Sequence, residues 1–202
     1  ALGYNTLSAV SGNNSNTAIG ASSMNRNTGS SNTAVGAAAL GGPAGTGSSN
    51  VAIGASALAA LTDGTFNTGV GNSCMDAATV GRYNTALGYN SLGSDIDGDG
   101  SVAVGYNALA DQESDSVNQG VYNVAVGFHA GATISTGIKN TAVGAYALDG
   151  VITGDGNVGL GYGAGMGLTS GYDNVYVGYE AGKIASSAVG CTFVGRAAGD
   201  AE

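Results

Sequence analysis

The chain has no Trp, a single Pro and few charged or aromatic residues, which make up 9% and 6% of its 202 residues. The single Pro excludes collagen and Pro-rich linkers, even though 38 residues are Gly. The shortage of bulky side chains argues against a thick globular core. Apolar residues nevertheless make up 43% of the chain and are evenly spaced, which argues against a disordered tract. We therefore expect a thin, regular fold.

Basic residues are also scarce, since five Lys and Arg stand against 14 Asp and Glu and give a formal net charge of -9. This charge repels phosphate backbones and anionic lipid head groups, so we expect no nucleic acid and no membrane surface as partner. No apolar run approaches the roughly 20 residues that span a bilayer. The first residues lack the basic start and apolar stretch of a signal peptide. We expect no membrane insertion by this segment and any secretion signal to lie outside it.

One phrase, Asn-Thr-Ala-Val/Ile-Gly, recurs along the whole sequence, and its final residue marks each unit as a reference glycine. The reference glycines are Gly3, Gly20, Gly36, Gly54, Gly71, Gly88, Gly105, Gly127, Gly144, Gly161, Gly178 and Gly195. They define twelve units, most of them 17 residues long. The only large departure is a five-residue insertion between Gly105 and Gly127. The pattern predicts a single repetitive domain, residues 1–202, without a linker.

Two alternating positions precede every reference glycine. The residue immediately before it is always Leu, Ile or Val, and the residue two positions earlier is Thr or Val, as in Val35 and Thr33. Because side chains alternate along a β-strand, both positions share one face, which we predict to be the core. The residue between them is mostly Ala or Gly until Tyr176 and Phe193. We expect this opposite, smooth face to pack closely against a partner chain.

An Asn stands four residues before the reference glycine in nine of eleven units, and Ser101 and Cys191 are the exceptions. Stacked at the strand spacing of about 4.8 Å, such amides can hydrogen-bond along the stack, so we predict a structural Asn ladder. The fourth residue after the reference glycine is Leu or Met up to Leu109 and mostly Gly beyond it. We expect this second leg of each unit to thin toward the C-terminus.

These units are rich in Gly, Asn, Ser and Thr and show only short runs of period two, which argues against an α-solenoid. The fold class we predict is all-β, a parallel β-solenoid with one unit per rung. Twelve rungs at about 4.8 Å predict a rod roughly 55 to 60 Å long. So thin a roll buries few aliphatic side chains against a large backbone entropy cost, which favours an oligomer.

The phrases at 32–36, 84–88 and 140–144 resemble the head repeats of trimeric autotransporter adhesins and the similar repeats of bacteriophage tail fibres. The resemblance extends over all twelve units. It implies a left-handed parallel β-roll, a homotrimer, and an extracellular position on a cell or virion surface. It also implies attachment to a host or cell surface through a glycan or protein receptor. The 17-residue unit is longer than in most adhesin heads and closer to the phage fibre repeats.

A short acidic segment is the most specific candidate for a metal site. Asp95, Asp97 and Asp99 occupy alternate positions before Gly100, as in calcium-binding loops. The segment is incomplete as an EF-hand, because Tyr106 stands where a bidentate Glu is required. The next connector could supply further ligands on the neighbouring rung, namely Asp111, Glu113 and Asp115. The alternative is a solvated acidic loop whose Asp and Gly residues make turns.

Aromatic residues recur immediately after the reference glycine, where we expect the corner of each rung. They are Tyr4, Tyr89, Tyr106, Phe128, Tyr162 and Tyr179. Exposed rings of this kind could bind a host glycan, and all but Tyr4 are candidate ligand residues. Aligned rings in a repeat can instead stack on one another or pack at a subunit seam.

Nothing in the sequence favours an enzyme. His129 is the only histidine, and it has no Ser or Cys nucleophile motif and no second metal ligand near it. Cys74 and Cys191 lie seven rungs apart, too far for a disulfide within one chain. Two other non-enzymatic functions stay open besides the attachment fibre. A self-assembling extracellular filament is one, and an ice-binding solenoid is the other, although the Thr rows are predicted to face inward.

Overall fold

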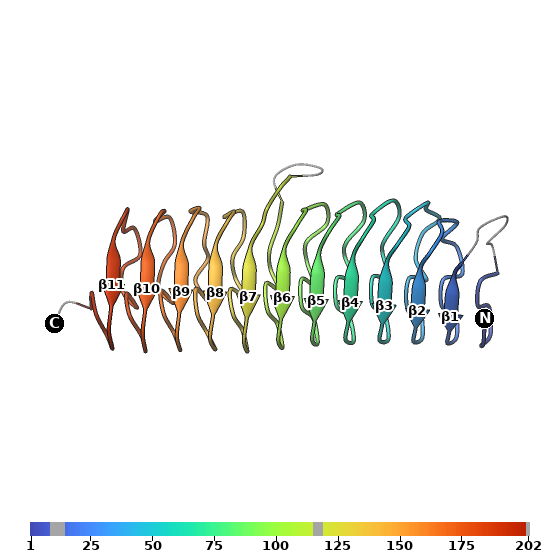
Figure 1. The fold of residues 1–202 in the computed structure, drawn as a ribbon, viewed down its shortest axis with the longest axis horizontal. Helices are drawn as coiled ribbons and strands as arrows, with labels where there is room; N and C mark the ends of the chain where they lie inside the picture. Colours follow the sequence, from blue (N-terminus) through green and yellow to red (C-terminus); the bar gives the residue numbers. More distant parts are fainter. Residues whose placement is uncertain (9–14, 115–118, 201–202) are drawn as a thin grey trace.

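The computed structural model describes residues 1–8, 15–114 and 119–200. Over these residues the chain winds into an elongated rod with one three-residue strand per turn and no helix (Figure 1). The strands are β1 (Thr17–Ile19), β2 (Thr33–Val35), β3 (Val51–Ile53), β4 (Thr68–Val70), β5 (Thr85–Leu87), β6 (Val102–Val104), β7 (Val124–Val126), β8 (Thr141–Val143), β9 (Val158–Leu160), β10 (Val175–Val177) and β11 (Thr192–Val194).

All eleven strands form one parallel sheet in sequence order. The register keeps equivalent repeat positions opposite each other, and it continues across the insertion, where Val102 of β6 pairs with Val124 of β7. An isolated bridge between Leu2 and Ile19 extends the pairing into the first unit. The predicted parallel β-solenoid with a spacing of about 17 residues is therefore confirmed over about ten turns.

Each strand ends at a corner that only Gly can form. At Gly88, for example, φ is +140°, and a Cβ would lie 2.2 Å from the carbonyl oxygen of Gly105 on the next rung. Two left-handed residues complete the turn, such as Asn90 (φ 50°) and Leu92 (φ 52°). The second of these places its side chain inside the rod, where Leu92 is 1% exposed. The corner therefore brings the second leg of the rung under the strand.

The core lies behind the central residue of each strand, so the predicted orientation of the strands was wrong. Central residues such as Ala52 and Ala86 are fully buried, whereas the outward Leu87 is 48% exposed. The reason is space. At the central residue Gly69, a Cβ would already lie 3.2 Å from Leu58 Cδ1 and 3.0 Å from the Cys74 sulfur. The second leg fills the interior, and only Ala or Gly fits opposite it in most rungs.

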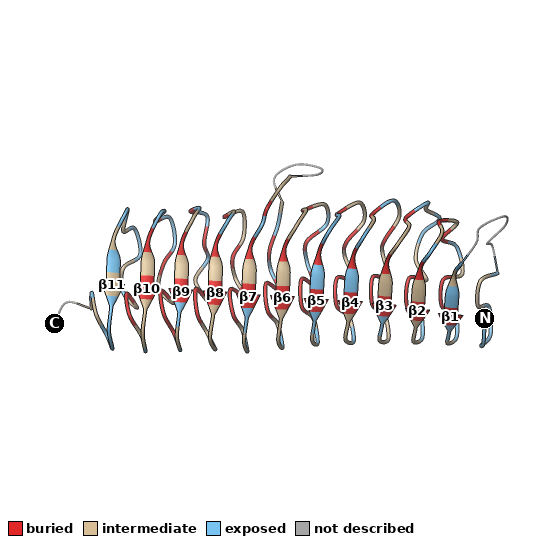
Figure 2. Cartoon of the chain, viewed as in Figure 1, coloured by how far each residue is buried: buried red, intermediate tan, exposed pale blue. Residues whose placement is uncertain are grey.

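Figure 2 makes this reversal visible as red bands at the centres of β1 to β10, with tan or pale blue on either side. The Ala face is thus the inner wall of the roll and does not meet a partner chain. The Thr, Val, Ile and Leu side chains predicted for the core instead point away from it.

Toward the C-terminus the sizes of the two core positions are exchanged. The central strand residue becomes large, and the second-leg residue opposite it becomes Gly. Tyr176 takes the central Ala position of β10 and is fully buried. The second-leg positions on both sides of it are Gly165 and Gly182, where a Cβ would lie 2.7 Å and 2.2 Å from its ring. Phe193 is opposed in the same way by Gly199, at 2.4 Å. The second leg thins as predicted, and the aromatic rings fill the space that its Leu side chains occupy elsewhere.

The predicted Asn ladder is confirmed. Each ladder Asn binds a backbone N–H and a backbone carbonyl of the next rung. Asn50 is typical: its Oδ1 accepts a hydrogen bond from the backbone N–H of Asn67 (2.9 Å), and its Nδ2 donates to the carbonyl of Gly64 (2.9 Å). Asn140 repeats this pattern with Asn157 and Gly154. These amides are completely buried and satisfy backbone groups that no strand partner reaches.

Candidate functional surfaces

The outward face of the sheet is the longest uniform surface of the molecule. The first residue of every strand is Thr or Val and the third is Val, Ile or Leu, so no strand residue is charged. Six of the eleven third residues are exposed, with 39% at Ile53 and 46% at Leu160, and the other five are half-buried. A contiguous apolar surface of this kind marks an interaction site more often than it marks free surface.

The three carboxylates of the first acidic connector bind different partners and do not share one ligand. Asp95 is buried, accepts hydrogen bonds from the Gly98 N–H (3.1 Å) and from Gln112 Nε2 (2.5 Å), and has its pKa raised by that burial. Asp97 Oδ1 accepts from the Thr79 hydroxyl (2.8 Å). Asp99 Oδ1 accepts from the backbone N–H of Arg82 (2.7 Å). Each carboxylate therefore has its own partner on another segment.

The second acidic connector does not complete a metal site among the described residues. Asp111 and Glu113 are fixed through their backbone N–H groups, which donate to the carbonyls of Ala132 and Ser135 on the next rung. Asp115 lies outside the described residues. Within the part of the chain that the structure describes, no group of three or more His, Cys, Asp or Glu side chains could hold a metal ion. The calcium site stays a prediction without a ligand cluster in the described residues.

The inserted connector has a structural role that the sequence reasoning missed. Ser101 interrupts the Asn ladder, and Gln112 places its amide in the gap. Its Oε1 accepts hydrogen bonds from Ser101 Oγ (3.2 Å) and Asn123 Nδ2 (3.0 Å), while its Nε2 donates to Asp95. Gln112 is fully buried. The loss of an Asn at the position that begins the extended unit was the available signal.

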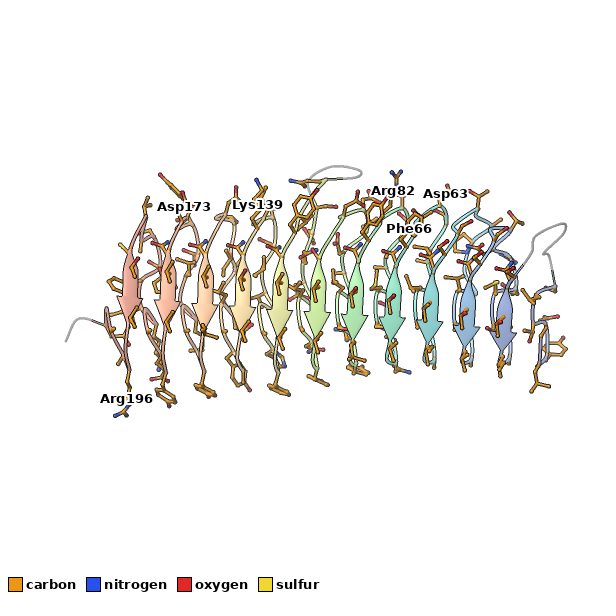
Figure 3. All side chains as sticks on the ribbon, in the orientation of Figure 1. Asp63, Phe66, Arg82, Lys139, Asp173 and Arg196 are labelled. Atoms are coloured by element: carbon orange, nitrogen blue, oxygen red, sulfur yellow. The ribbon has the colours of Figure 1, made fainter. Side chains whose placement is uncertain are left out.

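The aromatic residues that follow the reference glycines form stacks along one edge of the rod, the edge on which Arg196 lies in Figure 3. Tyr89, Tyr106 and Phe128 stack with centroids 5.3 Å apart and planes 12° from parallel. Tyr162 and Tyr179 stack similarly, at 5.3 Å and 11°. The ring faces are thus turned toward one another, and the half-exposed rings present mainly their edges to solvent. The stacking alternative is confirmed, while the glycan-binding role of these five residues stays a prediction.

His129 and Tyr146 connect the two stacks. The His129 ring lies 4.6 Å from Phe128 and 5.6 Å from Tyr146, and Tyr146 meets Tyr162 edge-on at 5.7 Å. Nearby, burial raises the pKa of the Asp149 carboxyl to about 6, and the adjacent His129 lowers it in part. Asp149 Oδ1 and the Thr133 hydroxyl are both buried without a hydrogen-bond partner.

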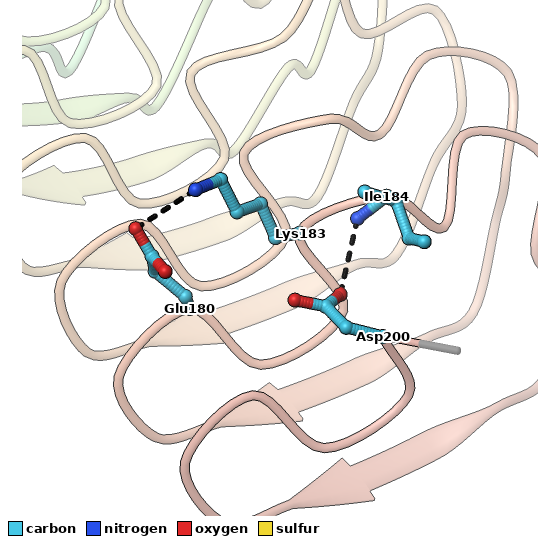
Figure 4. Close-up of polar contacts among 4 residues, drawn as sticks. All are labelled: Glu180, Lys183, Ile184 and Asp200. Atoms are coloured by element: carbon cyan, nitrogen blue, oxygen red, sulfur yellow. Dashed lines mark hydrogen bonds and ion pairs between the residues drawn. The ribbon is translucent and has the colours of Figure 1, made fainter. Parts of the chain in front are cut away.

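The C-terminal rungs carry the ion pair of the described residues, between Lys183 Nζ and Glu180 Oε1 at 3.0 Å (Figure 4). Asp200 accepts from the Ile184 N–H in the same region, at 3.3 Å. Both contacts are at the surface and stabilise the rod little. Cys74 is buried and Cys191 is partly buried, and neither forms a disulfide. Burial raises the pKa of the Cys74 thiol to about 11, which leaves it unreactive.

Comparison with protein families, with curated proteins and with solved structures finds no match for this chain. Among the described residues, no helix is long and apolar enough to cross a bilayer. The functional argument therefore rests on the rod and its surfaces.

Proposed function

We propose that this chain is a structural and binding segment of an extracellular attachment fibre, of the bacteriophage tail fibre or bacterial adhesin type, that mediates adhesion to a host or cell surface. One observation carries the proposal: a rigid rod whose whole sheet presents an uncharged face of Thr, Val, Ile and Leu. A rod of this kind can hold a receptor-binding surface away from the body that bears it. The role has no need of a catalytic centre.

In this proposal the outward sheet face is the seam between three copies of the chain, wound as left-handed rolls. Burying one Val, Leu or Ile side chain contributes about 1.5 to 3 kcal/mol, and each strand offers at least one such side chain. A seam of this composition contains no charges that could pair between copies. The register between copies is therefore set by the regular spacing of the rungs. The outward face thus takes the role of subunit interface that was expected for the Ala face, because the Ala face is buried inside the roll itself.

The experiment is a pair of Lys substitutions at the seam, Val104→Lys with Val126→Lys, compared with Ser94→Lys on an exposed connector. Three copies would bring six unpaired ammonium groups together in a dry interface, so we expect the seam variant to dissociate to monomers in sedimentation velocity. The Ser94→Lys control should remain assembled. Assembly unchanged by the seam substitutions would refute the proposed interface, and long filaments of the wild type would favour the self-assembling filament instead.

Ice binding is a second candidate, because the structure reverses the orientation that argued against it. Regular rows of Thr and aliphatic side chains now face outward over eleven strands. The two functions use the same surface and exclude each other. A stable monomer that slows ice growth, and loses this effect in the seam variant, would favour ice binding over the fibre.

A further inference from the structure

A groove lies on the edge of the rod opposite the aromatic stacks, where Figure 3 labels Lys139 and Asp173. Its volume is about 490 Å³, within the range of small-molecule sites. Three successive connectors line it, those that lead into β8, β9 and β10. They contribute Lys139, the segment 153–156, and the residues Ser170, Tyr172 and Asp173.

The middle rung of the groove has Gly at the position where the rungs on either side have charged residues. Gly156 holds the repeat position that Lys139 occupies one rung earlier and Asp173 one rung later. Its φ is +70°, and a Cβ there would lie 2.6 Å from Asp173 Oδ1. Earlier along the rod the same position is filled by Phe66 and Tyr83, which stack on each other at 5.3 Å. The Asp173 carboxylate therefore lies over Gly156, in the space that a side chain at position 156 would take.

Tyr172 differs from the rings of the opposite edge. It is 50% exposed, and among the described aromatic rings it has no stacking partner, so about half of its surface is accessible to a ligand. Asp155 is held in place beside it, because its Oδ1 accepts a hydrogen bond from the Ile138 N–H at 2.9 Å. The backbone N–H of Asp173 donates to the Asp155 carbonyl at 3.0 Å.

We propose that this groove binds a neutral pyranose unit of a surface glycan. The open Tyr172 ring offers an apolar platform for the C–H face of the sugar. The carboxylates of Asp155 and Asp173 accept hydrogen bonds from hydroxyls, and the Lys139 ammonium donates one. Two carboxylates against one ammonium disfavour phosphate, sulfate and acidic sugars. The inference rests on the proposed attachment function and names its receptor chemistry.

The test is saturation-transfer NMR on the assembled wild-type chain with methyl pyranosides of glucose, galactose, mannose and the N-acetylhexosamines. At least one should bind saturably with a dissociation constant below about 10 mM. Tyr172→Ala should weaken that binding about tenfold or more, because the platform is lost. Gly156→Asn should also abolish it, since Asn tolerates a left-handed backbone and its side chain would displace the Asp173 carboxylate. The matched control Tyr179→Ala removes a stacked ring at the opposite edge and should leave binding unchanged.

Three results would overturn the inference: no binding of any neutral glycoside, loss of binding in Tyr179→Ala but not in Tyr172→Ala, or binding of only a methyl sialoside. The outcome is separable from that of the fibre proposal. An assembled rod that binds no neutral sugar sinks the groove alone. Sugar binding that depends on Tyr172 in a chain that stays monomeric supports the groove and contradicts the trimer.

Discussion

The size exchange around Tyr176 offers the sharpest test of the core, through the single variants Tyr176→Ala and Gly182→Leu and their combination. Tyr176 is fully buried, and a Cβ at Gly182 would lie 2.2 Å from its ring. Removing a buried aromatic ring costs about 3 to 5 kcal/mol. Adding Leu against an intact ring overpacks the core and costs about 1 to 3 kcal/mol or more. The double variant restores the Ala and Leu combination that earlier rungs use.

We therefore expect Gly182→Leu to destabilise the wild type but to stabilise Tyr176→Ala, with a coupling free energy larger than the cost of about 1 to 3 kcal/mol that Gly182→Leu has in the wild type. Backbone strain does not confound the comparison, because Gly182 (φ 63°) and Leu148 (φ 48°) share the left-handed conformation. Gly163→Leu is the matched control, since its φ is +61° and a Cβ there meets nothing closer than 3.4 Å.

The measurement is urea unfolding of the wild type, the two single variants, the double variant and the Gly163→Leu control at one chain concentration, followed by circular dichroism, with the midpoint and slope fitted together. Additive effects of the two substitutions, with Gly182→Leu equally harmful in both backgrounds, would refute the packing argument. A Gly163→Leu control as damaging as Gly182→Leu would trace the effect to the backbone instead of the core.

Three further predictions follow from buried polar groups and from the acidic connectors. Asn140→Ala should lower the free energy of unfolding by about 2 to 5 kcal/mol in urea titrations, because the Asn157 N–H and the Gly154 carbonyl lose their partner. The control Asn72→Ala changes an exposed Asn and should be nearly neutral. Equal effects of the two substitutions would show that the ladder is not stabilising. Burial raises the pKa of Asp149 from 3.8 to about 6, so stability should fall as pH rises from about 4 through 6. Asp149→Asn should flatten that part of the plot of melting temperature against pH. An identical plot for both proteins would contradict the assignment. Because Asp95, Asp97 and Asp99 have separate partners, chelator should leave the melting temperature unchanged, whereas a calcium-dependent rise that Asp97→Ala abolishes would restore the calcium site.

The repeat made the architecture predictable from the sequence. Positions that recur every 17 residues must be stacked, so the parallel register and the Asn ladder followed directly from the reference glycines. The aromatic stacks followed for the same reason. A second Gly column stands three residues before eight of the nine ladder Asn residues, all except Asn16. Its carbonyls, such as those of Gly64 and Gly154, turned out to be the acceptors of the ladder amides.

Alternation alone could not show which strand face is buried, because a period of two residues defines two faces and does not say which of them points into the core. Hydrophobicity pointed to Val and Ile, while the deciding factor was the space left by the second leg. The paired exchange of Ala for Tyr176 and of Leu for Gly182 was a visible signal, since such compensation requires both positions to share one core. The groove was harder to foresee, because it is formed by residues of unrelated type on three successive connectors.

Solution mass tests the central claim most directly, because the proposed fibre uses the uncharged outward face of its eleven strands as the seam between three copies. Light scattering coupled to size exclusion should give three times the chain mass of 19.3 kDa, falling to a single chain in the Val104→Lys, Val126→Lys variant. A wild-type chain that remains monomeric over a wide range of concentrations would contradict the account, since the exposed Thr and aliphatic face would then be a free surface.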